Sequence, residues 1–122
     1  DYVRYVATYQ DRLWVPRGDQ IAFTHITGGG IAANLARVLH THLHADLRRG
    51  TWTPPAVFTT IGDLGNVDRV ELEKTLNMGI GMVVIVAPTD VAAVQSAINE
   101  PTFIIGSLVH HTSNQHSRVS LS

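Results

Sequence analysis

The hydrophobic and polar positions of this chain repeat with two periods, one typical of helices and one typical of strands. After three consecutive glycines, Ile31, Leu35 and Val38 recur at i, i+4 and i+7, which predicts one apolar face of a helix. Residues 82–87 form a continuous apolar run rich in branched side chains, which predicts a buried strand. The expected helices cover about residues 2–13, 31–39, 54–64, 68–76 and 89–98, and the expected strands 21–26, 42–47, 82–87, 102–110 and 116–121. We therefore expect an α/β (α+β) fold with a mixed sheet flanked by helices.

Local signals predict where two of these helices begin. Thr53 precedes a proline, so its hydroxyl is a candidate N-cap with proline at the first helical position. Asp68 and Glu71 form an acidic version of the capping box ahead of the next short helix. Gly65 is expected to end the helix between these two signals.

Composition narrows the function classes. The chain has 122 residues, a net charge of −1 and no cysteine. This length suits one domain, and the balanced charge offers no general attraction to nucleic acid or to an anionic membrane surface. The longest apolar run, residues 80–88, is far shorter than a membrane span. We expect no nucleic-acid or membrane partner, and the lack of cysteine fits a cytoplasmic location.

The sequence HITGGGIAANLARVL places three glycines between an expected strand and an expected helix. Backbone N–H groups at a helix start have no partner inside the helix, and glycine lets an anion approach without a Cβ in the way. The pattern therefore favours a phosphate site, although it is neither a Walker A loop nor GxGxxG. A tight strand-to-helix turn that needs glycine only for packing explains the triplet equally well. The candidate phosphate-binding residues are Thr27, Gly28, Gly29, Gly30, Asn34 and Arg37.

A second glycine-bearing segment, TLNMGIGMVVIV, joins a short helix to the apolar strand. Glycine at the entrance to a strand is typical of a bulge or a close backbone approach. We expect Asn77, Gly79 and Gly81 to line a cleft, together with His25. The alternatives are a helix cap followed by strand packing and, for His25, a core histidine.

Three histidines, at positions 40, 42 and 44, alternate and would share one side of a strand. Such an arrangement can bind zinc or nickel incidentally. We expect no physiological metal site in the chain.

Taken together and in register, the two glycine segments resemble those of the phosphoribosylformylglycinamidine cyclo-ligases, also called aminoimidazole ribonucleotide synthetases. RGTWTP, residues 49–54, is similar to actinobacterial members in particular. Two positions depart from the usual pattern, with Leu76 in place of phenylalanine and Ala36 in place of proline, and both remain apolar. The matching residues are 25–30, Asn34, 37–39, Trp52, Pro55, Phe58, Glu71, Thr75, Asn77, Gly79, Gly81 and Met82.

The resemblance implies that residues 1–122 are part of a C-terminal domain and that an N-terminal ATP-binding domain is absent. It implies an enzyme of purine biosynthesis that converts formylglycinamidine ribonucleotide and ATP to aminoimidazole ribonucleotide, ADP and phosphate. ATP and Mg would serve the full-length homodimer, with none bound to this piece. The glycine loop would hold the substrate phosphate, and no residue is identified as the general base.

Two other functions also fit the sequence. The chain could be a non-catalytic phosphate- or nucleotide-binding module on the same scaffold. It could also belong to a related ATP-dependent enzyme of the selenophosphate synthetase or thiamine-monophosphate kinase type. The pairing of TGGG with NMGIGM favours the cyclo-ligase.

Overall fold

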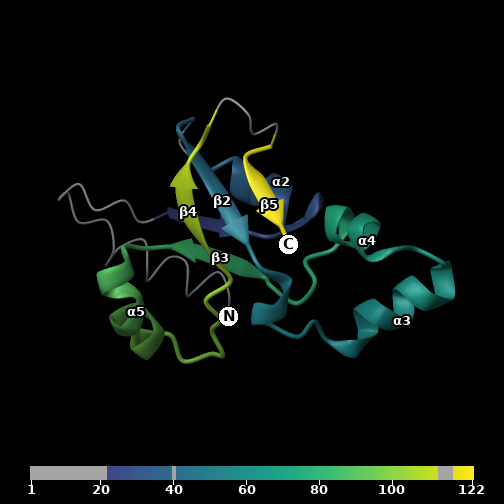
Figure 1. The fold of residues 1–122 in the computed structure, drawn as a ribbon. Helices are drawn as coiled ribbons and strands as arrows, with labels where there is room; N and C mark the ends of the chain where they lie inside the picture. The colour runs from purple at the N-terminus through teal and green to yellow at the C-terminus, as the bar shows by residue number, and fades with distance from the viewer. Residues whose placement is uncertain (1–21, 40, 113–116) are drawn as a thin grey trace. The chain divides into compact units, whose positions relative to one another are not determined.

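The computed structural model describes residues 22–39, 41–112 and 117–122. The predicted helix over residues 2–13 therefore lies outside the described residues, as do His40 and His116. Figure 1 shows the arrangement of the helices and strands. The elements are β1 (Ala22–His25), α2 (Gly30–Ala36), β2 (Leu43–Leu47), η1 (Arg49–Thr51), α3 (Ala56–Gly65), α4 (Arg69–Thr75), β3 (Met82–Ile85), η2 (Pro88–Asp90), α5 (Val91–Ala97), β4 (Gly106–His110) and β5 (Val119–Leu121).

The chain divides into two compact units. The first comprises residues 1–23 and 84–102, and its described part contains η2 and α5, where the Gln95 side-chain amide donates to the Thr102 hydroxyl at 3.1 Å. The second comprises residues 24–83 and 103–122 and holds the candidate site residues. Strands β1 and β3 form a two-stranded sheet.

A three-stranded sheet in the order β4-β2-β5 is the centre of the second unit (Figure 1). Strand β2 is antiparallel to β4, with Ala45 opposite Leu108, and parallel to β5, with Ala45 opposite Val119. The sheet is therefore mixed, and the prediction of an α+β fold with a mixed sheet and helices is confirmed.

The core of this unit lies where α2 packs against β5 and α4. Ile31 and Leu35, two of the residues that predicted the helical face, are almost completely buried. The helix ends at Ala36, three residues before the predicted end, and Leu39 is buried beyond it. Ala45 and Leu47, on the central strand β2, are buried as well.

The predicted N-cap at Thr53 is wrong, because α3 begins at Ala56 with Pro55 in the N-cap position and no side-chain cap. A residue before proline is pushed out of the helical region, so Thr53 and Pro54 both stay outside the helix. The capping box is confirmed, since the Asp68 carboxylate accepts from the Glu71 N–H at 2.9 Å.

All five predicted strands are shorter in the structure, three of them by two or more residues at one end. Strand β4 starts at Gly106 instead of residue 102, because its ladder with β2 ends at the pair Leu47–Gly106, where β2 turns into η1. Strand β3 ends at Ile85 instead of residue 87. Strand β5 covers residues 119–121 of the predicted 116–121.

Candidate functional site

The three glycines of the loop between β1 and α2 differ in their structural surroundings. Gly29 adopts φ +99° and Gly30 φ +76°, a region that L side chains rarely enter. A Cβ on Gly30 would overlap the backbone carbonyl of Glu73, so the start of α2 contacts the backbone of α4 directly. A Cβ on Gly28 would meet nothing within 4 Å. Packing therefore explains Gly30, backbone conformation explains Gly29, and neither explains Gly28.

Asn34 closes this loop from inside the protein. Its side-chain amide nitrogen lies 3.2 Å from the carbonyl oxygen of Thr27, 3.3 Å from that of Gly28 and 2.7 Å from that of Gly30. Its amide oxygen accepts from the Thr27 hydroxyl at 3.2 Å and from the Arg37 guanidinium at 3.5 Å. Because Asn34 is buried and its polar atoms are engaged in these contacts, it supports the loop from behind.

The outer side of the loop is open. Thr27, Gly28 and Gly29 are exposed. The Gly30 N–H donates to the Thr27 carbonyl at 3.2 Å, whereas the N–H groups of Gly28 and Gly29 make no hydrogen bond to another described residue. Two adjacent backbone donors on an exposed glycine loop can hydrogen-bond an anion.

The second glycine segment lies beside the first. The N–H of Ile26, one residue before Thr27, donates to the Gly81 carbonyl at 2.9 Å. This bond brings together two segments that are more than fifty residues apart in the sequence. His25, the last residue of β1, is exposed next to this junction. The structure therefore places Gly81 and His25 beside the glycine loop.

Asn77 shapes the turn that precedes Gly81. Its side-chain oxygen accepts from the Gly79 N–H at 2.9 Å, and its carbonyl accepts from the Ile80 N–H at 3.0 Å. Met78 and Gly79 both have positive φ, +54° and +91°. The Asn77 side chain therefore stabilises a left-handed turn, the Asx-turn role typical of asparagine.

Trp52 and Pro55, which both precede α3, hold this turn in place. The buried Trp52 indole N–H donates to the Met78 carbonyl at 3.1 Å. A Cβ on Gly79 would lie 2.5 Å from the ring of Pro55, so only glycine allows this contact. The hydrogen bond from Trp52 to Met78 links two segments that no local sequence pattern connects.

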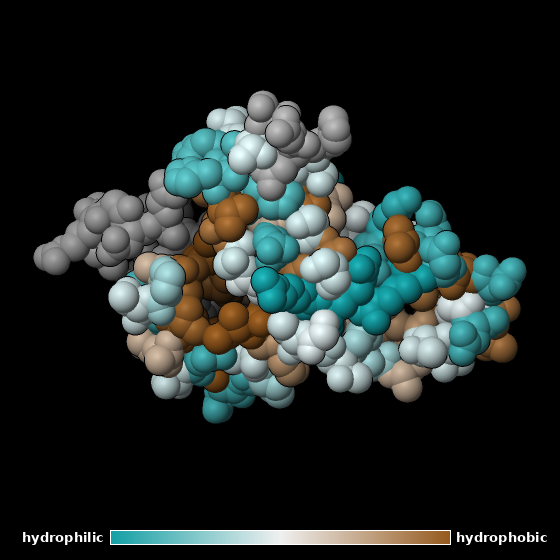
Figure 2. Space-filling model, viewed as in Figure 1, coloured by the Kyte–Doolittle hydropathy of each residue, from teal (hydrophilic) through white to brown (hydrophobic). Residues whose placement is uncertain are grey.

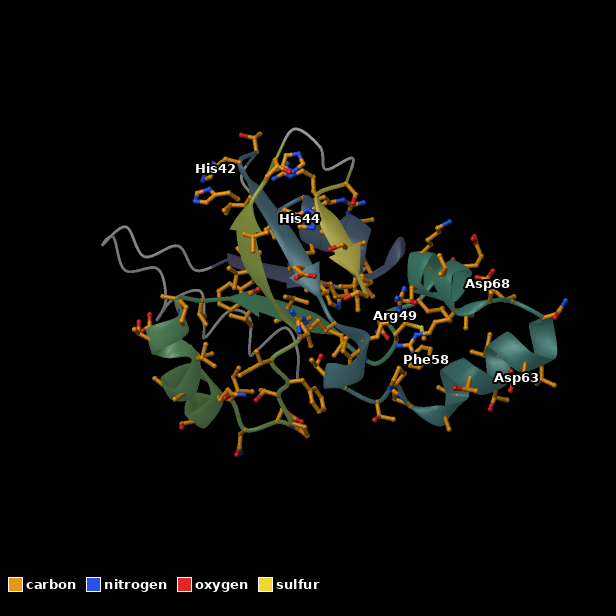
Figure 3. All side chains as sticks on the ribbon, in the orientation of Figure 1. His42, His44, Arg49, Phe58, Asp63 and Asp68 are labelled. Carbon is orange, nitrogen blue, oxygen red and sulfur yellow. The ribbon has the colours of Figure 1, made fainter. Side chains whose placement is uncertain are left out.

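No local sequence pattern predicts a role for Arg49 or Glu73. Glu73 is a buried carboxylate on α4, and the Arg49 side chain contacts it (Figure 3). Both oxygens of Glu73 lie 3.0 Å from Arg49 Nε. Their separation of twenty-four residues falls outside every helical or strand period, so a local pattern could not pair them.

The histidines on β2 differ in their surroundings (Figure 3). His44 is buried, with Nδ1 2.9 Å from the Ser117 carbonyl and Nε2 3.0 Å from the Ser120 hydroxyl, whereas His42 is exposed. Within the described ranges, no group of three or more histidine, cysteine, aspartate or glutamate side chains could hold a metal ion. None of the helices described is long and apolar enough to cross a membrane.

Comparison with known proteins identifies relatives of the chain. A family model described as AIR synthase related protein, C-terminal domain, matches residues 7–117. A Streptomyces fradiae protein, provisionally named phosphoribosylformylglycinamidine cyclo-ligase, is 63% identical over 67 residues, which is 55% of this chain and 37% of that protein. The phosphoribosylformylglycinamidine cyclo-ligase of Trichlorobacter lovleyi is 41% identical over 100 residues, 80% of this chain and 29% of that enzyme. The chain thus spans roughly a third of the length of these relatives.

Proposed function

Because the chain belongs to the AIR synthase related protein, C-terminal domain family, we propose that it supplies the substrate-phosphate site of a phosphoribosylformylglycinamidine cyclo-ligase. The reaction would convert formylglycinamidine ribonucleotide and ATP to aminoimidazole ribonucleotide, ADP and phosphate. The names of the relatives support this activity over the selenophosphate synthetase or thiamine-monophosphate kinase type. They also support it over a non-catalytic phosphate-binding module.

The exposed loop Thr27–Gly30 is the observation that carries the proposal. Gly28 and Gly29 are exposed, their N–H groups have no hydrogen-bond partner among the described residues, and no Cβ blocks Gly28. The Asn34 amide fixes the loop carbonyls behind it, so the donors are held in place before a ligand arrives. A preorganised pair of donors of this kind suits the ribose phosphate of the substrate.

The contribution of this chain to the reaction would be binding and orientation. Ring closure joins two ends of one molecule, so a fixed substrate geometry lowers the barrier through proximity. ATP, when bound, supplies a phosphoryl group that turns the formyl oxygen into a leaving group. The Thr27–Gly30 loop would hold the opposite, phosphate end of the substrate, and the Asn77–Gly81 turn would line the cleft beside it.

We assign ATP and Mg to a part of the enzyme beyond this chain. Among the described residues, no group of three or more histidine, cysteine, aspartate or glutamate side chains could hold a metal ion. The proposed partners are an N-terminal ATP-binding domain and a second copy in a cytoplasmic homodimer. The chain spans only about a third of the length of these relatives, and this supports a further domain in the full-length enzyme.

Gly28→Val is the most informative test of the loop. Gly28 has open space and no positive φ, so valine there blocks an approaching ligand without straining the fold. Gly50→Val is a matched control, because Gly50 is exposed with the same open surroundings. Ribose 5-phosphate would be titrated into both ¹⁵N-labelled variants and the wild-type chain. The loss of one charge-assisted hydrogen bond, roughly 1.5–3 kcal/mol, predicts an affinity at least about tenfold lower for Gly28→Val alone.

Two outcomes would contradict the proposal. An unchanged affinity in folded Gly28→Val would assign the glycines to packing and backbone conformation only. The 122-residue chain is expected to form no aminoimidazole ribonucleotide from substrate and ATP, and turnover by the purified chain would contradict the assignment of the ATP site to another part of the enzyme.

A further inference from the structure

Glu73 is an acidic side chain that the proposed reaction does not use, yet it is buried on α4. Its side chain is 9% exposed, and Arg49 Nε lies 3.0 Å from each of its carboxylate oxygens. Arg69, one turn earlier on α4, places its Nε 3.5 Å from Oε1. Burial of a carboxylate is costly unless the charge is paired and hydrogen-bonded. The two arginines supply that pairing.

Arg49 connects this carboxylate to the end of the mixed sheet. Its Nη1 donates to the Leu121 carbonyl at 3.0 Å, and its backbone N–H donates to the Ser122 carbonyl at 2.8 Å. Figure 3 shows Arg49 between the end of β5 and α4. One guanidinium thus joins η1, β5 and α4, which gives α4 a defined position against the sheet.

The same residue of α4 contacts the glycine loop through its backbone. The Glu73 carbonyl lies where a Cβ of Gly30 would be, and the Lys74 backbone is the next nearest contact. Gly30 ends the loop in which Gly28 and Gly29 are exposed and their N–H groups have no hydrogen-bond partner among the described residues. Any shift of the last turn of α4 would therefore move the loop, since close-packed backbones transmit displacement.

We propose that Arg49 and Glu73 are positioning residues whose ion pair sets the conformation of the Thr27–Gly30 loop for phosphate binding. This inference rests on the proposed function of the loop. The ion pair acts through the Glu73 backbone on Gly30 and has no contact with the substrate in this scheme. Arg49 needs its planar fork for the role, because one head group serves both the Glu73 carboxylate and the Leu121 carbonyl.

The test uses two substitutions on opposite sides of the pair, Arg49→Lys and Glu73→Gln, in the ¹⁵N-labelled 122-residue chain. Lysine keeps the charge and loses the fork, whereas glutamine keeps the shape and loses the charge. Lys74→Gln is the matched control, because it breaks the exposed 3.4 Å Lys74–Glu71 pair on the same helix. Two quantities are measured: the amide signals of Gly28 and Gly29 without ligand, and the dissociation constant for ribose 5-phosphate corrected for the folded fraction.

Both test variants are expected to displace the Gly28 and Gly29 signals and to raise the dissociation constant about tenfold, the equivalent of roughly one charge-assisted hydrogen bond. The control should change neither. If the wild-type chain binds ribose 5-phosphate and the folded variants show the same affinity and the same Gly28 and Gly29 signals, the positioning role is overturned and the phosphate site is not. No binding by the wild-type chain would overturn the phosphate site and the inference with it. If Glu73→Gln does not fold, Arg49→Lys decides, and unfolding of both would show a purely structural ion pair and overturn the positioning role.

Discussion

The indole N–H of Trp52 donates a 3.1 Å hydrogen bond to the carbonyl of Met78, which has φ +54°. Both residues are buried. A bulky side chain in the left-handed region is strained by about 1–3 kcal/mol and persists only where its surroundings hold it. The Trp52 bond, the Asn77 side chain and the contact of Pro55 with Gly79 provide those surroundings.

Trp52→Phe should lower the free energy of unfolding by about 1–3 kcal/mol beyond the effect of the smaller ring, because it leaves the buried Met78 carbonyl unpaired. Urea denaturation followed by circular dichroism measures the change. Thr51→Val is the neighbouring control, since its hydroxyl bond to the Arg48 carbonyl is exposed. Equal small losses in both variants would show that the Trp52 bond does not hold the turn.

Gly30→Ala and Gly28→Ala should differ strongly in stability. The first adds a methyl group where the Glu73 carbonyl lies and imposes positive φ on alanine, so we expect a loss of about 3 kcal/mol or more. The second adds a methyl group to open space, and we expect a change within about 0.5 kcal/mol. Thermal unfolding of the two proteins compares them directly. Similar stabilities would mean that α2 and α4 do not meet at Gly30.

Asn34→Asp should destabilise the glycine loop. The substitution replaces a donor that faces three backbone carbonyls with a charged acceptor, and unpaired buried groups cost about 1–3 kcal/mol, more when charged. Asn66→Asp is a control of the same chemistry at an exposed left-handed position after α3, where aspartate is tolerated. If the two variants unfold at the same denaturant concentration, Asn34 does not organise the loop.

The exposed face of α3 predicts self-association. Val57, Ile61 and Leu64 recur at helical spacing and are 56%, 44% and 85% exposed. Figure 2 shows hydrophobic residues among polar ones over α3 and α4. Several large apolar side chains exposed on one face of a helix favour association with another apolar surface.

Sedimentation velocity at increasing concentration should detect larger species of the wild-type chain. The double substitution Ile61→Lys and Leu64→Lys should reduce them, because burying two charged side chains in an apolar contact costs free energy. Thr59→Lys, on the same exposed helix, should have little effect. A strict monomer of the wild-type chain at high concentration would contradict the prediction.

Signals carried by neighbouring residues were sufficient to predict most elements of the fold. The buried face of α2 follows from the spacing of Ile31 and Leu35, and the start of α4 follows from Asp68 and Glu71. The prediction at Thr53 failed although Pro54 and Pro55 are adjacent in the sequence, because the restraint of a second proline outweighs a capping hydroxyl.

The candidate site divides in the same way. The sequence alone determined that the glycines form a loop between a strand and a helix and that Asn34 lies on that helix, because a glycine-rich strand-to-helix turn is a local pattern. Only the tertiary structure decided that Gly30 meets the Glu73 backbone, that Gly28 faces open space and that Arg49 pairs with Glu73. Such contacts join segments brought together by packing of the core, and their partners share no local period. The physical role of each residue therefore depends on neighbours that the linear sequence does not identify.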